Sequence, residues 1–163
     1  MPNIDRLIVY ARDFLNRHGI GNVIAQRLDL YDTPQLLYRP QSAEGAFIEI
    51  PFSITKKEPL RLLINGTTSY DFGKYQAFLN GVKIGEIMDF YSDTVQNKEF
   101  HLLDFWPDVG EYTLRLECVG KNKMSDGFFL GIESVRLRER RPHVYEYGHD
   151  KDKDWRKNPI LYR

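Results

Sequence analysis

Apolar and polar residues alternate along much of the chain, with the two-residue period of β-strands. The clearest case is the run 46–53, where Ala46, Ile48, Ile50 and Phe52 share one parity. This pattern predicts a half-buried strand. Pro51 lies within it, and because proline has no N–H to donate, we expect this strand to be at a sheet edge or bulged there.

The same pattern predicts further strands at 23–28, 35–39, 60–64, 75–79, 82–84, 100–105, 112–118 and 128–137. Pro34 and Pro40 bracket the strand at 35–39, which favours a place near an edge. Asn80-Gly81 separates two strands and predicts a hairpin with positive φ at both central residues. In the last strand the apolar parity changes between Ile132 and Val135, which predicts a β-bulge near Glu133.

The segment 7–15 fits two structures. Leu7, Ala11, Phe14 and Leu15 have helical spacing, whereas 7–10 is rich in strand-forming residues. We favour a strand because the rest of the pattern is β.

About eight to ten short strands with a turn signal every 8–12 residues predict an all-β fold. We expect a jelly-roll β-sandwich of two antiparallel sheets over residues 1–140. After Pro142 the composition shifts, and residues 141–163 are predicted to be an extended C-terminal tail. Its mixed-charge run, 149–154, is followed by Trp155 and then by the apolar run 160–162. Either this tail is solvated, or its apolar residues dock on this sandwich or on a neighbouring copy.

Composition narrows the classes of partner and compartment. The 23 Lys and Arg residues balance the 23 Asp and Glu residues, so the basic excess that drives nucleic-acid binding is missing. No run approaches the roughly 20 apolar residues of a membrane span, and the first six residues do not resemble a secretory signal. We therefore expect no nucleic-acid or membrane partner, and a cytoplasmic location unless the chain was excised from a longer exported protein.

The only cysteine, Cys118, excludes an internal disulfide. It has the parity of Tyr112, Leu114 and Leu116, which predicts a buried, unreactive side chain.

Signals of catalysis are weak. The four histidines are scattered, no zinc-ligand spacing is present, and no phosphate-binding loop occurs. We predict no catalytic residue, metal or cofactor. Asp71 with Asp89 or Asp93 could form the carboxylate pair of a glycosidase, but the sequence does not give their separation.

Three polar signatures fall in the predicted loops: Tyr70-Asp71-Phe72-Gly73, Asp89-Phe90-Tyr91 and Gly120-Lys121-Asn122. Sugar rings stack on aromatic faces, and carboxylate, amide and ammonium groups bond to their hydroxyls. The candidate ligand-binding residues are Tyr70, Asp71, Phe72, Asp89, Tyr91, Lys121 and Asn122. Two structural roles compete with this hypothesis, because Asp71 is a natural turn former and Asn122 can brace a neighbouring loop.

With the later runs 110–114 and 131–137, these signatures resemble the carbohydrate-binding-module-like jelly-roll domains of bacterial glycoside hydrolases. The chain looks most like those of the difructose-dianhydride-synthase type of glycosidase and its multidomain relatives, over about Leu7 to Arg138. This resemblance implies a non-catalytic carbohydrate-binding-like or assembly module. The alternative is a subunit or fragment of a glycosidase whose active site forms at a subunit interface. Relatives of this kind often form oligomers, which implies a homo-oligomer held through the C-terminal tail.

One departure from the relatives concerns calcium. Calcium-carrying relatives have two acidic residues, one residue apart, on the first strand and an Asp in the last strand. Here those positions are Tyr10, Arg12 and Glu133. Because an arginine repels a cation that needs six or more oxygen ligands, we predict that this calcium is absent.

Overall fold

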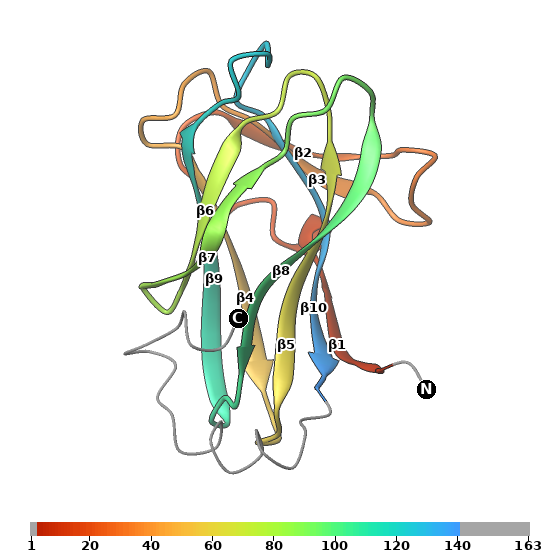
Figure 1. The fold of residues 1–163 in the computed structure, drawn as a ribbon, viewed down its shortest axis with the longest axis vertical. Coiled ribbons are helices and arrows are strands. Elements are labelled where there is room, and N and C mark those ends of the chain that lie inside the picture. Colours follow the sequence, from red (N-terminus) through yellow and green to blue (C-terminus); the bar gives the residue numbers. More distant parts are fainter. Residues whose placement is uncertain (1–2, 141–163) are drawn as a thin grey trace.

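A computed structural model describes residues 3–140 of the chain, which fold as ten β-strands and one short 3-10 helix (Figure 1). The strands are β1 (Asp5–Tyr10), β2 (Asn22–Gln26), β3 (Gln35–Arg39), β4 (Phe47–Ile54), β5 (Leu60–Thr68), β6 (Lys74–Leu79), β7 (Val82–Asp89), β8 (Gln96–Phe105), β9 (Gly110–Gly120) and β10 (Leu130–Glu139). The helix η1 (Ala11–Asp13) follows β1 directly.

The strands form two antiparallel sheets that pack face to face. One sheet has the order β2-β3-β10-β5-β8, and β1 joins it by pairing with β10 beyond the end of β3. The other has the order β4-β9-β6-β7. The expected all-β sandwich of two antiparallel sheets is confirmed.

The core between the sheets comes from the predicted alternation. On β9, Tyr112, Leu114, Leu116 and Cys118 are buried, and the residues between them are more exposed. On β4 the even-numbered residues from Ile48 to Ile54 are buried in the same way. The predicted burial of Cys118 is therefore confirmed.

Several local predictions can be compared with the backbone. Asn80 and Gly81 have φ values of 48° and 82° and form the turn of the β6–β7 hairpin. The register of β10 against β5 shifts between Ile132 and Ser134, which confirms the predicted bulge at Glu133. In the ambiguous segment 7–15, the strand ends at Tyr10 and gives way to η1.

The strand that contains Pro51 is an edge strand, as predicted, since β9 is the one strand within residues 3–140 with which β4 pairs. The carbonyl of Phe47 and the N–H of Glu49 face away from β9, toward residues 17–19. Because the β4–β9 register continues without a shift, residue 51 faces the same open edge. Proline at that position leaves the edge without one donor.

The outer face of the six-stranded sheet is covered by charged side chains rather than left apolar. Leu63, the exception to the alternation on β5, points to this face but is buried, with Arg136 and His101 as its cross-strand neighbours. Next to it, the buried Asp104 carboxylate accepts hydrogen bonds from Arg61 at 2.7 and 3.0 Å. His101 Nε2 lies 2.9 Å from Asp104 Oδ1, and Arg140 Nε lies 3.3 Å from Oδ2.

Two further predictions concern a membrane-spanning segment and the C-terminal tail. Over the range that the structure describes, there is no helix with the length and apolarity to cross a membrane. The division into a sandwich at 1–140 and a tail at 141–163 stays a prediction, because the tail lies outside the described residues.

The Asp104 cluster predicts an acid-dependent loss of stability. Burial would raise the pKa of Asp104, but hydrogen bonds from His101 and Arg61 outweigh it and lower the pKa to about 2. A lowered folded-state pKa contributes stability above the unfolded-state pKa near 4, and that stability is lost as the pH falls toward 2. We expect this loss to be on the order of 2 kcal/mol in the free energy of unfolding.

Urea unfolding at a series of pH values measures this loss of stability. The Asp104→Asn variant should lose less stability between pH 4 and pH 2 than the unmodified chain. Asp108→Asn is the matched control, because Asp108 is exposed and its pair with Lys57 contributes little. The same pH dependence in the chain and in Asp104→Asn would contradict the prediction.

Candidate functional site

The three loops that carry the polar signatures meet at one end of the sandwich (Figure 1). They are residues 69–73 between β5 and β6, 90–95 between β7 and β8, and 121–129 between β9 and β10. Backbone hydrogen bonds join them: Ser69 N–H donates to the Phe90 carbonyl at 3.0 Å, and Asp126 N–H donates to the Tyr70 carbonyl at 2.9 Å. The structure therefore brings the three signatures together.

Asp89 and Asn122 form what we call the loop clamp. Asn122 Nδ2 donates to Asp89 Oδ2 at 2.8 Å, and the other carboxylate oxygen accepts from Tyr91 N–H at 3.0 Å. Asn122 Oδ1 accepts from Met124 N–H at 3.0 Å. Both side chains thus use their polar atoms to hold loops 90–95 and 121–129 together, which is the bracing role expected of Asn122 as an alternative.

Ser125 ties the same loop to the first signature. Its buried hydroxyl lies 2.7 Å from the Phe72 carbonyl and 3.2 Å from the Tyr70 carbonyl. Lys121, whose side chain is exposed, donates from Nζ to the Ser125 carbonyl at 2.9 Å. Loop 69–73 is therefore held through its backbone carbonyls, and its side chains do not take part in these contacts.

Those side chains line a cavity of about 300 Å³, which we call the Tyr70 pocket. Its polar lining comes from Gln26, Gln35, Arg39, Thr67, Ser69 and Asp71, and its apolar lining from Leu28, Leu37, Phe72, Val95 and Phe129. Tyr70 is 53% exposed at its rim, whereas Phe72 is 5% exposed. The pocket thus combines a free aromatic ring with polar groups and apolar contacts.

The floor of the Tyr70 pocket contains a buried amide. Gln35 is 0% exposed; its Oε1 accepts from Thr67 Oγ1 at 2.6 Å and its Nε2 donates to Gln26 Oε1 at 2.9 Å. An amide nitrogen carries two hydrogens. Within residues 3–140 these contacts supply an acceptor for only one of them. A buried donor without an acceptor costs about 1–3 kcal/mol, so a ligand that accepts this hydrogen bond would relieve that cost.

Asp71 also borders a second cavity, of about 280 Å³, on the side of Asp126 and Pro40. Burial and the negative charge of Asp126 raise the pKa of Asp71 above its ordinary value. The carboxylate that influences Asp71 is therefore Asp126, not one of the two partners considered from the sequence. Two carboxylates beside one cavity can share a proton.

The seven sequence-predicted residues thus separate into two groups. Tyr70, Asp71 and Phe72 line the Tyr70 pocket, whereas Asp89, Tyr91, Lys121 and Asn122 are engaged in contacts within and between the other two loops. Sequence reasoning missed the residues that β2 and β3 contribute. The shared parity of Gln35, Leu37 and Arg39 could have placed those three on one face, but not beside Tyr70.

The positions considered for calcium lie close together. Tyr10 pairs with Ser134, next to Glu133 in the bulge of β10. The Glu133 carboxylate accepts hydrogen bonds from Asn65 at 3.1 Å and from Ser134, and the Arg12 guanidinium lies 5.0 Å from the Tyr10 ring centroid. Among residues 3–140, no group of three or more His, Cys, Asp and Glu side chains could hold a metal ion.

No protein-family model matches the sequence, and no curated protein matches it. Solved structures do match the fold. Xanthan lyase from Paenibacillus superposes with a TM-score of 0.71 at 20% identity, over 84% of this chain and 13% of the lyase. A family 35 carbohydrate-binding module from an environmental isolate has a TM-score of 0.57 at 16% identity, over 80% of this chain and 91% of the module.

A family 36 carbohydrate-binding module in complex with calcium and xylotriose has a TM-score of 0.50 at 10% identity, over 80% of this chain and 98% of the module. The chain thus spans only a small part of the lyase but nearly the whole of these modules. At these identities the likeness concerns the fold. Residues 3–140 have the β-sandwich fold of carbohydrate-binding modules, and no specific family is identified.

The loop clamp predicts a measurable coupling. A hydrogen bond to a charged group contributes about 1.5–3 kcal/mol to stability, so Asp89→Ala and Asn122→Ala should each destabilise the fold. In a double-mutant cycle by chemical denaturation, the coupling energy should reach about 1 kcal/mol or more. The exposed pair Ser53 and Glu111, also 2.8 Å apart, is the control and should couple more weakly. A coupling energy near zero between Asp89 and Asn122 would contradict this prediction.

Calcium should not stabilise the protein. An ion that binds the native state at a hundredfold excess over its Kd adds about 2.7 kcal/mol and raises the melting temperature by several degrees. We expect melting curves with excess calcium, with magnesium and with a chelator to coincide. A rise of several degrees that is specific to calcium would contradict the prediction.

Proposed function

We propose that this chain is a non-catalytic carbohydrate-binding module and that it holds its ligand in the Tyr70 pocket. The observation that carries the proposal is an exposed tyrosine ring at the rim of a cavity whose floor presents a buried amide donor. The fold shared with family 35 and family 36 modules supports the same function.

The chemistry of the pocket suits a sugar. A pyranose ring offers C–H groups that stack on an aromatic face and hydroxyl groups that both donate and accept. Tyr70 supplies the face, Asp71 accepts hydrogen bonds, and Gln35 and Arg39 donate them. The volume of about 300 Å³ is at the lower end of small-ligand pockets, which favours one or two sugar rings.

In this proposal the seven candidate residues have different roles. Tyr70, Asp71 and Phe72 contact the ligand, and the clamp residues Asp89 and Asn122 keep their loops in place. Direct ligand contact by Asp89, Tyr91, Lys121 and Asn122 stays a prediction. The finer kinship with the difructose-dianhydride-synthase type and the homo-oligomer through residues 141–163 also stay predictions.

One observation favours a second candidate, the glycosidase subunit. Asp71 lies beside Asp126 at the second cavity, and its raised pKa is the property that a general acid needs. A partner subunit would have to complete such a site. Release of reducing sugar by the purified chain would favour this candidate, and loss of that release in Asp71→Asn would assign it to Asp71.

Binding without turnover tests the proposed module. Saturable binding to a glycan array, followed by calorimetry on the best glycan, should be weakened at least about tenfold by Tyr70→Ala, which corresponds to about 1.4 kcal/mol. Tyr10→Ala is the matched control, since Tyr10 lies on β1, outside the pocket. If no glycan binds, or if Tyr70→Ala binds as tightly as the control, the proposal is wrong.

A further inference from the structure

Two cavities of similar size adjoin at loop 69–73. The Tyr70 pocket has a volume of about 300 Å³, and the second cavity, which we call the Asp126 cavity, has a volume of about 280 Å³. Tyr70, Asp71 and Phe129 line both of them, so the two cavities share a wall. A ligand made of linked sugar rings could therefore fill both cavities while it contacts the exposed ring of Tyr70.

The Asp126 cavity is acidic and has no neutralising partner. Its charged lining consists of Asp71 and Asp126, and no lysine, arginine or histidine among the described residues lines it. Within residues 3–140 neither carboxylate has an ion pair. Burial and the charge of Asp126 raise the pKa of Asp71, as expected where negative charges meet without a positive one. A cation in this cavity would remove that repulsion.

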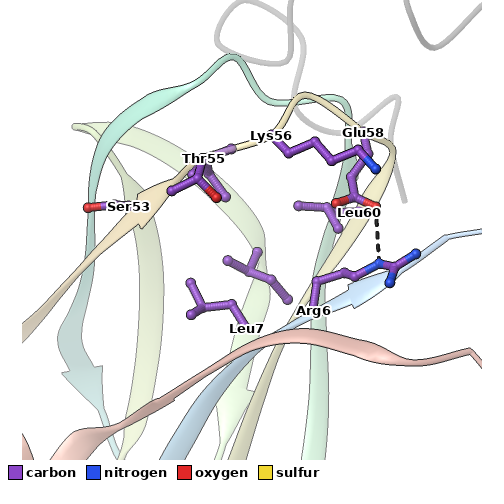
Figure 2. Close-up of a pocket in the computed structure, with 9 residues that line it drawn as sticks. Arg6, Leu7, Ser53, Thr55, Lys56, Glu58 and Leu60 are labelled. Atoms are coloured by element: carbon purple, nitrogen blue, oxygen red, sulfur yellow. Dashed lines mark hydrogen bonds and ion pairs between the residues drawn. The ribbon is translucent and has the colours of Figure 1, made fainter.

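A cavity at the opposite end of the sandwich has the reverse character. Figure 2 shows Arg6 of β1 facing Glu58 of the β4–β5 connection, with 3.2 Å between Arg6 Nε and Glu58 Oε1. The acid at that rim is thus neutralised by the protein itself, and the lining within residues 3–140 includes no aromatic side chain. The carboxylates beside Tyr70 are left for a ligand to neutralise.

A second observation points to a ligand independently of the carboxylates. Gln35 is fully buried at the floor of the Tyr70 pocket, and its Nε2 donates one of its two hydrogens to Gln26. The other has no acceptor among the contacts within residues 3–140. With Arg39, which lines the same pocket, this amide makes the floor rich in donors. The two adjoining cavities therefore differ in polarity.

We propose that the ligand is an oligosaccharide with a free amino group and that Asp71 and Asp126 bind its ammonium. This inference rests on the proposed function, since it extends the ligand of the Tyr70 pocket into the Asp126 cavity. An ammonium has three donors and no acceptor, so it matches the carboxylates and not the donors on the pocket floor. The amino sugar therefore occupies the Asp126 cavity, a neutral ring occupies the Tyr70 pocket, and the ligand has at least two rings.

The positive charge should decide which sugar is preferred. A hydrogen bond between an ammonium and a carboxylate is roughly twice as strong as one between neutral groups. Asp71 is half-buried, which limits the screening of its charge by solvent and salt. Acetylation of the amine, or its replacement by a hydroxyl group, removes the charge. We therefore expect the free amine to be preferred at least about tenfold over either form.

Three matched oligosaccharide series test the proposal. The β-1,4-linked oligomers of glucosamine, N-acetylglucosamine and glucose share one backbone and differ at one substituent of each ring. In calorimetry at about pH 6, below the pKa of an amino group, the glucosamine dimer should bind at least about tenfold more tightly than the other two dimers. The glucosamine monomer should bind more weakly than its dimer, because it leaves one cavity empty.

Two carboxylate variants assign the preference to the cavity. Asp126→Asn should lower the preference for glucosamine to about threefold or less. It should leave the loop in place, because the residue 126 N–H that donates to the Tyr70 carbonyl is retained. Asp93→Asn is the matched control, since Asp93 is exposed and lines neither cavity, and it should leave the preference unchanged.

Failure of this inference and failure of the proposed function give different results. Neutral oligomers that bind as tightly as glucosamine oligomers, and lose binding in Tyr70→Ala, would overturn the inference and leave the sugar-binding function in place. A preference for glucosamine that is unchanged in Asp126→Asn would also overturn the inference alone. If no glycan binds, charged or neutral, or if glucosamine binding is unchanged in Tyr70→Ala, both are wrong.

Discussion

The pairing of β10 on both of its sides is the constraint on which the six-stranded sheet depends. β5 runs along one side of β10, while β3 and then β1 share the other. The bulge at Glu133 keeps the apolar residues of both halves of β10 on the core side. Leu130 and Ile132 face the core before it, and Val135 and Leu137 face the core after it. Without the extra residue, one half of β10 would turn its apolar side chains to solvent.

The same strand explains which part of the site the sequence could not reveal. Gln35 on β3 and Thr67 on β5 are 32 positions apart, and β10 lies between their strands. Their side chains touch because Gly131, the residue of β10 between them, has no side chain. A Cβ on Gly131 would lie 2.6 Å from Gln35 Oε1, so the amide crosses the sheet only over glycine. The sequence pattern predicted each of these strands. It carries no information on strand order, and strand order made this pocket floor.

The loop signatures were a better guide to position than to exposure. Tyr70 and Phe72 have the same parity, yet one ring is mostly free and the other is almost wholly buried. The difference arises because the loop is fixed through its carbonyls by Ser125 and Asp126, residues more than fifty positions away. Residue types alone therefore identified which loops meet, while the distant contacts decide which side chains face a ligand.

The missing donor at Pro51 has a consequence for molecules that meet in solution. An exposed strand edge is a template onto which a strand of another molecule can add, and repeated addition produces fibrils. A strand that added to the β4 edge would have one carbonyl, opposite Pro51, with no N–H from which to accept a hydrogen bond. A single residue that costs this sheet little in its own fold thus helps to keep neighbouring sheets from joining into a continuous one.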